Sequence, residues 1–215
     1  MSDSPKHALQ GLYGITDSKL MPDDETMAVR VKAAIAGGMS ILQYRDKSTD
    51  QDKRLRQARL LMDICDSAGV LFLINDDVDL ALACNAHGVH LGQSDEQLAS
   101  AREKLGSKAI IGISCENSLE LARKASGQGA DYIAFGRFFT SKTKPDAPET
   151  PVSILQDAKE QFALPVVAIG GITVENAGLL IEAGADSLAV INDLFARDEP
   201  EAITSRAQDF VNLYN

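Results

Sequence analysis

The segment Glu182-Ala183-Gly184-Ala185-Asp186 ends a helical stretch and leads directly into the apolar run 188–191. A glycine at this place is typical of a helix C-terminus, where a residue in the left-handed conformation stops the helix. Similar helix ends precede other apolar runs, at Gly37-Gly38, Gly69 and Gly129. The chain therefore repeats one small unit, in which an apolar run is followed by a polar loop and a helical stretch.

Eight apolar runs are candidate strands, and a helical segment follows each of them: 12–16, 41–44, 71–74, 89–91, 110–113, 132–135, 166–169 and 188–191. The runs lack strict alternation of polar and apolar residues, as expected of parallel strands covered by helices. The repetition over residues 1–215 predicts a single domain, a (β/α)8 TIM barrel with eight parallel strands, preceded by a flexible N-terminal extension over residues 1–10. An open doubly wound sheet is the rival fold. Such a sheet usually carries a glycine-rich loop after its first strand, where this chain has Thr16-Asp17-Ser18.

The composition is that of a globular protein with a substantial core, since 45% of the residues are hydrophobic and the net charge is −10. The negative charge argues against nucleic-acid binding, because no basic stripe is available to pair with phosphates. No apolar run approaches the roughly 20 residues that span a bilayer, and the first residues lack the apolar core of a signal peptide. A cytoplasmic protein without membrane partners is therefore expected, and apolar side chains on its helices could support a homo-oligomer. Cys65, Cys84 and Cys115 have no paired spacing and are expected to be reduced, structural residues.

Polar residues follow the candidate strands, and in a TIM barrel the C-terminal strand ends meet at one mouth, where the chemistry is done. Asp76 follows the third run and Asp95 the fourth, so the two carboxylates would be neighbours. Carboxylate oxygens suit Mg²⁺, which often bridges to a substrate pyrophosphate. We therefore expect a Mg²⁺ site at Asp76 and Asp95, although Asp95 could instead cap the helix that starts at Glu96.

Cations occupy other strand ends of the same mouth. Arg45 and Lys47 follow the second run, and Lys144 lies in the loop after the sixth. Arginine offers phosphate a bidentate fork, whereas lysine acts as a mobile point charge. Gln43 and Arg45 alternate in an extended segment, so both would point into the barrel, where an arginine needs an anionic partner. Two carboxylates and several cations at one mouth predict a metal-dependent enzyme that acts on phosphorylated substrates.

The glycines of the mouth come late in the chain. Gly170-Gly171 ends the seventh run, next to the end of the eighth run at Val190-Ile191. Backbone amides from these two loops, together with a helix N-terminus, commonly hold a phosphate in this fold. The loop 141–151 is long and polar, so we expect a lid or flexible binding segment there, with an ordinary solvated loop as the alternative.

His90 lies within the fourth run and is expected to be a hydrogen-bonded core histidine. No Ser-His-Asp order or Cys-His pairing stands out along the chain, so nucleophilic catalysis is not expected.

Taken together, these segments resemble the thiamine-phosphate synthase family. The resemblance runs from about Leu12 to Phe195, in the order in which the family shows its motifs. Its most distinctive piece is Gly88-Val89-His90-Leu91-Gly92-Gln93-Ser94-Asp95, whereas the Gly170-Gly171-Ile172 ending is shared with other phosphate-binding barrels. The other matching segments are 12–17, 43–47, 74–77, 111–114, 140–144 and 168–172.

The resemblance implies a TIM-barrel transferase that joins hydroxymethylpyrimidine pyrophosphate to hydroxyethylthiazole phosphate and releases thiamine phosphate and pyrophosphate. The implied route is dissociative, because pyrophosphate leaves first and the thiazole nitrogen captures the pyrimidine methyl cation. Charge accumulates on the leaving group, so Mg²⁺ and cations would lower the barrier by electrostatic stabilisation.

The resemblance also implies a role for each matching residue. Asp76 and Asp95 would be the Mg²⁺ ligands, and Lys144 would bind the departing pyrophosphate, close to Ser114. The remaining implied contacts are Gln43, Arg45, Lys47 and Asn75 to the pyrimidine pyrophosphate, Ser141 and Thr143 to the thiazole phosphate or pyrophosphate, and Gly171, Val190 and Ile191 to the thiazole phosphate. Among these, Ser114, Lys144 and Arg45 would be the catalytic residues.

The chain departs from the family pattern at two places. The loop reads Thr140-Ser141-Lys142-Thr143-Lys144 where the family usually has Pro-Thr-x-Thr-Lys, and the loss of proline loosens the backbone. Asn192 stands where the family often has serine, which puts the side-chain role there in doubt but not the backbone phosphate site.

Three other functions stay open from the sequence. A thiazole tautomerase paralogue would share the barrel and the phosphate cradle, but it needs neither the carboxylate pair nor the pyrophosphate cations. A non-catalytic barrel that binds thiamine precursors has no evident need for a metal-bound leaving group. A sugar-phosphate isomerase or epimerase would call for a clear acid–base pair. Mg²⁺-dependent pyrophosphate release distinguishes all three from the synthase.

Overall fold

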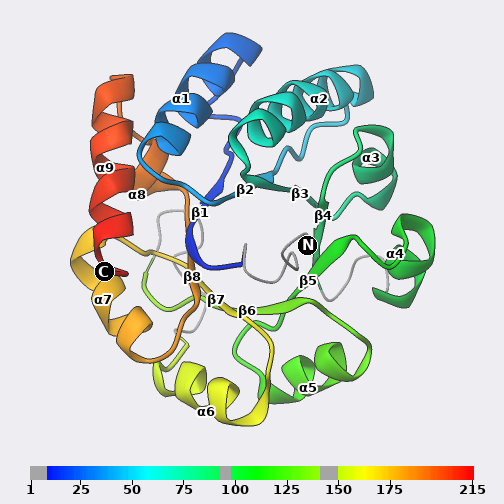
Figure 1. Cartoon of the computed structure of the whole chain (residues 1–215), viewed down its shortest axis with the longest axis vertical. Helices are drawn as coiled ribbons and strands as arrows, with labels where there is room; N and C mark the ends of the chain where they lie inside the picture. The colour runs from blue at the N-terminus through cyan, green and yellow to red at the C-terminus, as the bar shows by residue number, and fades with distance from the viewer. Residues whose placement is uncertain (1–8, 93–97, 141–149) are drawn as a thin grey trace.

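The strands form one closed parallel barrel in chain order, as the sequence predicts (Figure 1). The computed structural model describes residues 9–92, 98–140 and 150–215. Pairing of β8 with β1, in the register Gly11↔Ser187 and Tyr13↔Ala189, closes the ring and rules out the open doubly wound sheet. The strands are β1 (Gly11–Ile15), β2 (Ile41–Tyr44), β3 (Leu71–Asn75), β4 (Gly88–Leu91), β5 (Ile110–Ser114), β6 (Tyr132–Gly136), β7 (Val166–Ile169) and β8 (Ser187–Val190).

Helices form an outer ring around the barrel (Figure 1), and several of them begin at a polar residue whose side chain caps the first turn. Asp23, Asp50 and Asp77 each accept a hydrogen bond from a backbone N–H in the first turn of the next helix, a role in which aspartate is favoured. The helices are α1 (Asp24–Ala36), α2 (Gln51–Ala68), α3 (Val78–Ala83), α4 (Leu98–Leu105), α5 (Leu119–Gly127), α6 (Ser153–Gln161), α7 (Val174–Glu182), α8 (Asn192–Phe195) and α9 (Pro200–Asn212).

Strand boundaries differ from the sequence prediction by one residue at several ends, and two of these differences matter at the mouth. Thr16 was expected in the first strand, but β1 ends at Ile15 and the Thr16 hydroxyl accepts a hydrogen bond from the Arg45 N–H. Ile191 was expected in the last strand, but its backbone, with φ −118° and ψ −79°, already turns into α8. Both residues therefore belong to the loops of the mouth.

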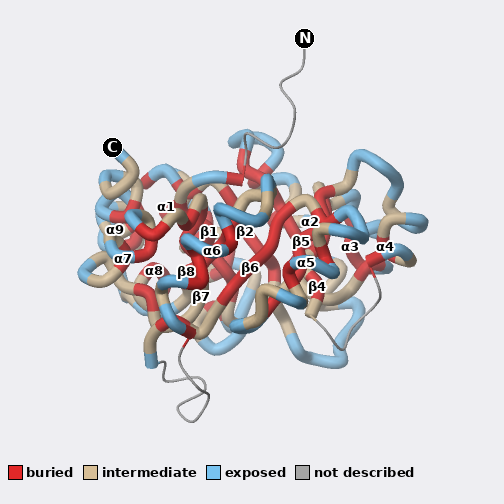
Figure 2. The backbone as a smooth tube through the Cα atoms, turned by 90° about the horizontal axis from the view of Figure 1, so that it is seen from below, coloured by how far each residue is buried: buried red, intermediate tan, exposed pale blue. Residues whose placement is uncertain are grey.

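Two separate cores follow from the alternation of side chains along the strands. One core lies inside the barrel and includes Tyr13, Ile41, Leu73 and Tyr132. The larger core lies between the barrel and the helices, and it receives the intervening strand residues such as Leu42. Figure 2 shows the buried strands at the centre of the molecule and the exposed segments at the periphery.

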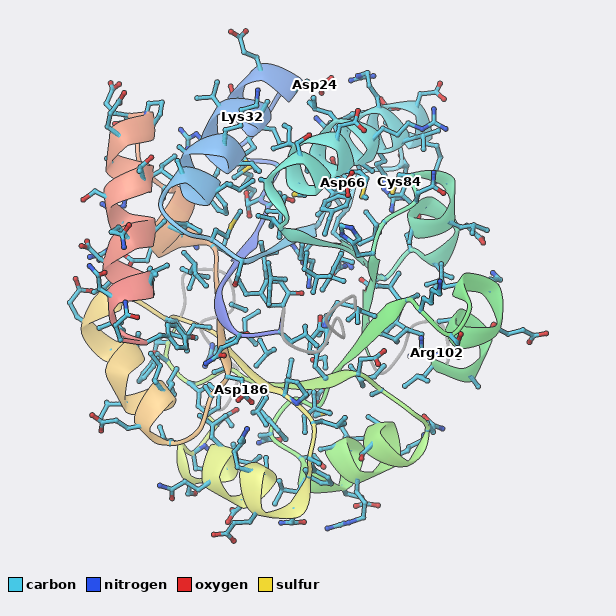
Figure 3. The ribbon with its side chains drawn as sticks, viewed as in Figure 1. Asp24, Lys32, Asp66, Cys84, Arg102 and Asp186 are labelled. Atoms are coloured by element: carbon cyan, nitrogen blue, oxygen red, sulfur yellow. The ribbon has the colours of Figure 1, made fainter. Side chains whose placement is uncertain are left out.

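Two Gly-Ala-Asp segments fasten the N-terminal ends of the strands. Asp131 precedes β6 and accepts hydrogen bonds from the Ile111 N–H of β5 and from Arg102 of α4. Asp186 precedes β8 and accepts in the same way from the Val166 N–H of β7, at 2.7 Å, and from Lys159 of α6. In Figure 3, Arg102 lies on the side of α4 that faces the barrel. Each aspartate thus joins a strand, its neighbour and a helix.

The three cysteines are free, as predicted, and all of them are buried. Burial raises the pKa of the Cys65 and Cys115 thiols to about 12, so both are protonated and unreactive at neutral pH.

No helix in the described part of the chain is long and apolar enough to span a membrane. Most of the expected extension 1–10 lies outside the described residues, but Leu9 is buried and packs in the interior core.

Candidate active site

Asp76 lies at the mouth of the barrel, and its backbone conformation and its partners differ from those of its neighbour Asp77. Its φ is 66°, in the left-handed region that aspartate and asparagine tolerate better than most residues. Its Oδ2 accepts hydrogen bonds from Lys47 Nζ, at 2.8 Å, and from Asn75 Nδ2. Asp77 instead caps α3 and pairs with Arg54 at 2.8 Å. The structure thus brings Lys47, Asn75 and Asp76 together and gives Asp77 a structural role.

β2 supplies Gln43 to the site, and Arg45 is the first residue after this strand. The Arg45 backbone is held by Thr16, whose Oγ1 accepts from the Arg45 N–H at 2.8 Å. Within the described ranges, the Arg45 guanidinium has no hydrogen-bond or ion-pair partner. Gln43 is only 3% exposed and lies in the barrel interior, where its Nε2 donates to the Tyr13 hydroxyl at 2.7 Å. A partly exposed arginine beside Lys47 that has no partner in the described part of the chain is suited to bind an anion.

A chain of buried and part-buried hydrogen bonds crosses the barrel below the mouth. The Tyr13 and Tyr132 hydroxyl oxygens are 3.0 Å apart, and the Tyr132 oxygen is 2.8 Å from His90 Nδ1. Desolvation lowers the pKa of His90 to about 4, so the ring is neutral at pH 7. The predicted hydrogen bond of this histidine is present, although the residue is only partly buried. Together with Gln43 these side chains form a polar floor, which we define as Gln43, Tyr13, Tyr132 and His90.

Gly112 of β5 makes room for this floor. A Cβ on Gly112 would lie 1.9 Å from the Cζ atom of Tyr132, so only glycine lets the Tyr132 ring extend across the interior. Ser114, the last residue of β5, has the same parity as Gly112 in the strand. It is therefore on the interior side, one step nearer the mouth.

The ends of β7 and β8 form the predicted phosphate cradle. Gly170 and Gly171 have φ values of 107° and 64°, which favour glycine. A Cβ on Gly171 would lie 2.6 Å from the Phe139 carbonyl oxygen and 2.7 Å from that of Thr140, so the backbone leaving β6 packs directly on this turn. The start of the loop that continues into 141–149 therefore lies against the cradle.

Side chains from α7 and α8 hold the two halves of the cradle. The Asn176 amide donates to the Gly171 carbonyl oxygen and accepts from the Thr173 N–H. Asp193 of α8 accepts from the Val174 N–H of α7 at 3.1 Å and pairs with Arg206 at 2.9 Å.

Val190 and Ile191 differ in the direction of their side chains. Val190 packs in the outer core, whereas Ile191 packs against the interior core. The Val190 side chain therefore faces away from the mouth, and Val190 could contact a phosphate there only through its backbone.

Four predicted residues lie outside the described residues: Asp95, Ser141, Thr143 and Lys144. Within the described ranges no group of three His, Cys, Asp or Glu side chains converges as a metal site. Asp76 nevertheless supplies a carboxylate that is 25% exposed at the mouth. Because Mg²⁺ keeps several waters and is often held by one or two carboxylates, this residue fits such an ion.

Sequence reasoning missed Tyr13 and Tyr132 as part of the site. Both occupy interior positions of their strands, which the alternation could have indicated, but nothing in the sequence shows that two residues 119 positions apart meet. It also missed Asn176 and Asp193, which act on the cradle from the helices.

The fold and the site define a (β/α)8-barrel enzyme whose polar groups gather at the C-terminal strand ends, where enzymes of this fold carry out their chemistry. Residues 12–194 match the profile of the thiamine monophosphate synthase family. The chain is 49% identical over 198 residues to a thiamine-phosphate synthase of Thioalkalivibrio sulfidiphilus, covering 92% of this chain and 93% of that protein. It belongs to this family and is a transferase of thiamine biosynthesis.

Solved structures agree with this assignment. Thiamine phosphate pyrophosphorylase from Pyrococcus furiosus superposes with a TM-score of 0.83 at 32% identity, covering 96% of each chain. The enzyme of the same name from Bacteroides thetaiotaomicron has a TM-score of 0.69 at 17% identity, covering 95% of this chain and 97% of that one. At that identity the second match shows the fold alone.

Proposed function

We propose that this enzyme joins hydroxymethylpyrimidine pyrophosphate to hydroxyethylthiazole phosphate, giving thiamine phosphate and pyrophosphate with the help of Mg²⁺. The observation that carries the proposal is the cluster of Asp76, Lys47 and Asn75 at the ends of β2 and β3. Beside it lies Arg45, whose guanidinium has no partner among the residues that the structure describes. This combination of a hard oxygen ligand and cations suits a pyrophosphate leaving group. The match to a synthase over nearly the whole chain supports the same reaction.

In the proposed reaction the bond between the pyrimidine methylene carbon and the pyrophosphate oxygen breaks first, and its electron pair stays on the oxygen. The thiazole nitrogen then donates its lone pair to the methylene cation and forms the new carbon–nitrogen bond. Arg45 and Lys47 would stabilise the charge that develops on the pyrophosphate, near Ser114. Mg²⁺ held by Asp76 and Asp95 would neutralise part of the same charge.

The second substrate would be held on the opposite side of the mouth. Backbone amides at Gly171 and around Ile191 would bind the thiazole phosphate, in a cradle whose two halves are tied by Asp193. This leaves the thiazole ring between the cradle and the cations of β2. Such positioning of two reactants accounts for catalysis without an acid–base pair.

The proposal is tested by supplying both substrates to the purified protein and measuring thiamine phosphate and pyrophosphate. We expect the two products in equal amounts, and we expect both to disappear on addition of EDTA and to return with excess Mg²⁺. Turnover that is unaffected by EDTA would contradict the metal assignment. Proton exchange on the thiazole without pyrophosphate release would instead favour the tautomerase.

Lys144 provides a prediction about the leaving group. Lys144→Ala is expected to lower kcat by about a hundredfold. A cation that acts mainly on developing charge stabilises the transition state more than the bound substrate, so its loss raises the barrier. The dissociation constant of thiazole phosphate should change much less.

Lys142→Ala removes the same charge from the same loop two residues away and is the matched control. It should leave kcat within about twofold of the wild type. Equal losses of kcat and of thiazole-phosphate affinity in Lys144→Ala would mean that the lysine only positions substrate.

A further inference from the structure

One arginine of α9 connects the two helices that follow the phosphate cradle. α9 packs beside both α7 and α8 (Figure 1). Arg206, in the middle of α9, donates from Nε to Asp193 Oδ2 and from Nη2 to Asp193 Oδ1, each at 2.9 Å. Its Nη2 also donates to the Glu175 carboxylate of α7 at 2.9 Å. A bidentate fork of this kind fixes the direction of a carboxylate as well as its place.

The carboxylate that Arg206 holds also contacts the backbone next to the cradle. Asp193 Oδ2 accepts a hydrogen bond from the Val174 N–H at 3.1 Å. Val174 is the first residue of α7 and comes three residues after Gly171. At such a position the backbone N–H has no acceptor inside its own helix. Asp193 itself comes two residues after Ile191, so it joins the segment that follows β7 to the segment that follows β8.

Asp193 brings a negative charge to the side of a site that would receive a phosphate. The side chains of Asp193 and Arg206 are only 14% and 17% exposed, so water solvates this pair poorly. Arg197 approaches Asp193 Oδ1 at 3.3 Å, but its shorter hydrogen bonds go to the Asp193 carbonyl oxygen. Arg206 is therefore the main group that offsets the carboxylate charge, and without it Asp193 would repel a bound phosphate.

We infer that Arg206 is a positioning residue for the phosphate of the second substrate and that it acts through Asp193. It fixes the Asp193 carboxylate between α7 and α8, and it offsets a charge that would otherwise weaken phosphate binding. Neither side chain is required to touch the ligand. The inference rests on the proposed function, since it names what sets the affinity of the cradle for thiazole phosphate.

The first test needs no substrate. Because the Val174 N–H has no acceptor within α7, its hydrogen exchange reports the bond to Asp193 directly. We expect this amide to be protected in the wild type. Its exchange rate, measured by NMR, should rise by about tenfold or more in Asp193→Ala and by a smaller factor in Arg206→Met, where the carboxylate is less firmly held. A wild-type amide that exchanges like an exposed one, or a rate that is unchanged in Arg206→Met, would overturn the inference.

The second test separates charge from packing by calorimetric titration with hydroxyethylthiazole phosphate. Arg206→Met removes the charge but keeps an unbranched stem, and the Kd should rise by about tenfold. Asp193→Asn removes the negative charge and keeps an oxygen that can accept from the Val174 N–H, so it should bind at least as tightly as the wild type. The double variant should recover a Kd within about threefold of the wild type. A double variant that binds as weakly as Arg206→Met would show that the loss comes from disturbed packing, and charge compensation by Arg206 would be wrong.

Steady-state kinetics add a readout that general destabilisation would not reproduce. In Arg206→Met the KM for thiazole phosphate should rise, whereas kcat and the KM for the pyrimidine pyrophosphate should stay within about twofold of the wild type. Similar losses for both substrates would contradict a role confined to the cradle.

Arg102→Met is the matched control. Arg102 pairs with Asp131 at 2.6 Å, both side chains are mostly buried, and Asp131 likewise accepts from a backbone N–H, but this pair lies at the N-terminal ends of the strands. Its loss should lower stability and leave the Kd for thiazole phosphate unchanged. A wild type that does not bind thiazole phosphate would refute the proposed second substrate and leave hydrogen exchange to decide the role of Arg206. A wild type that binds it, with an unchanged Kd in Arg206→Met, would refute the inference alone.

Discussion

Asp76→Asn is expected to lower turnover by about two to three orders of magnitude while the barrel remains folded. The carboxylate is the described member of the predicted Mg²⁺ pair, and the loss of one group that stabilises developing charge typically costs this much. Asparagine is the informative replacement because it also tolerates the left-handed backbone seen at φ 66°. Alanine would add backbone strain and confuse the two effects.

The metal dependence of the variant separates two roles for the carboxylate. If Asp76 binds Mg²⁺, the concentration of Mg²⁺ that gives half of the maximal rate should rise at least about tenfold in Asp76→Asn. If Asp76 only holds Lys47, the rate should fall with an unchanged Mg²⁺ requirement, and the metal assignment would be wrong. Asp79→Asn removes a carboxylate from an exposed position on α3 and should leave both quantities unchanged.

The barrel could be predicted because its signals are local. Glycine at helix ends, such as Gly69 with φ 69°, and apolar runs of strand length mark each unit, and parallel strands then leave few ways to close the sheet. The positions of Asp76 and Lys47 at the mouth followed from the same reasoning, since both come just after strand ends. Their direct contact at 2.8 Å could not be predicted, because it depends on the turn that each loop makes.

Contacts across the barrel could not be predicted from the sequence, for a different reason. The alternation of side-chain direction along each strand predicts that Tyr13 and Tyr132 face the interior, but β1 and β6 are not neighbours in the ring. Whether two interior side chains meet depends on the heights of their strands and on the space left by others. Here that space is left by Gly112, whose sequence context resembles that of any other glycine in an apolar run.

Gly112→Ala is therefore expected to destabilise the protein strongly. The added Cβ would lie 1.9 to 2.4 Å from three atoms of the Tyr132 ring, and the ring cannot move easily. It is hydrogen-bonded to Tyr13 and His90 and stacks on the His90 ring with centroids 5.6 Å apart. Overpacking of this kind costs about 3 kcal/mol or more in the free energy of unfolding, which in a chain of this size lowers Tm by roughly 6 to 12 °C.

Gly178→Ala is the matched control because it makes the same chemical change where nothing lies within 4 Å of the new Cβ. In the middle of α7 alanine should stabilise the protein by about 0.5 to 1 kcal/mol, because it is the better helix former. Thermal unfolding of the two variants should therefore move Tm in opposite directions. Combining Gly112→Ala with Tyr132→Val removes the ring with which the added methyl group would clash. The loss of unfolding free energy in the double variant should therefore be smaller than the sum of the losses in the two single variants. Additive losses would show that the barrel accommodates the methyl group in another way and that Gly112 is not what allows Tyr132 to cross the interior.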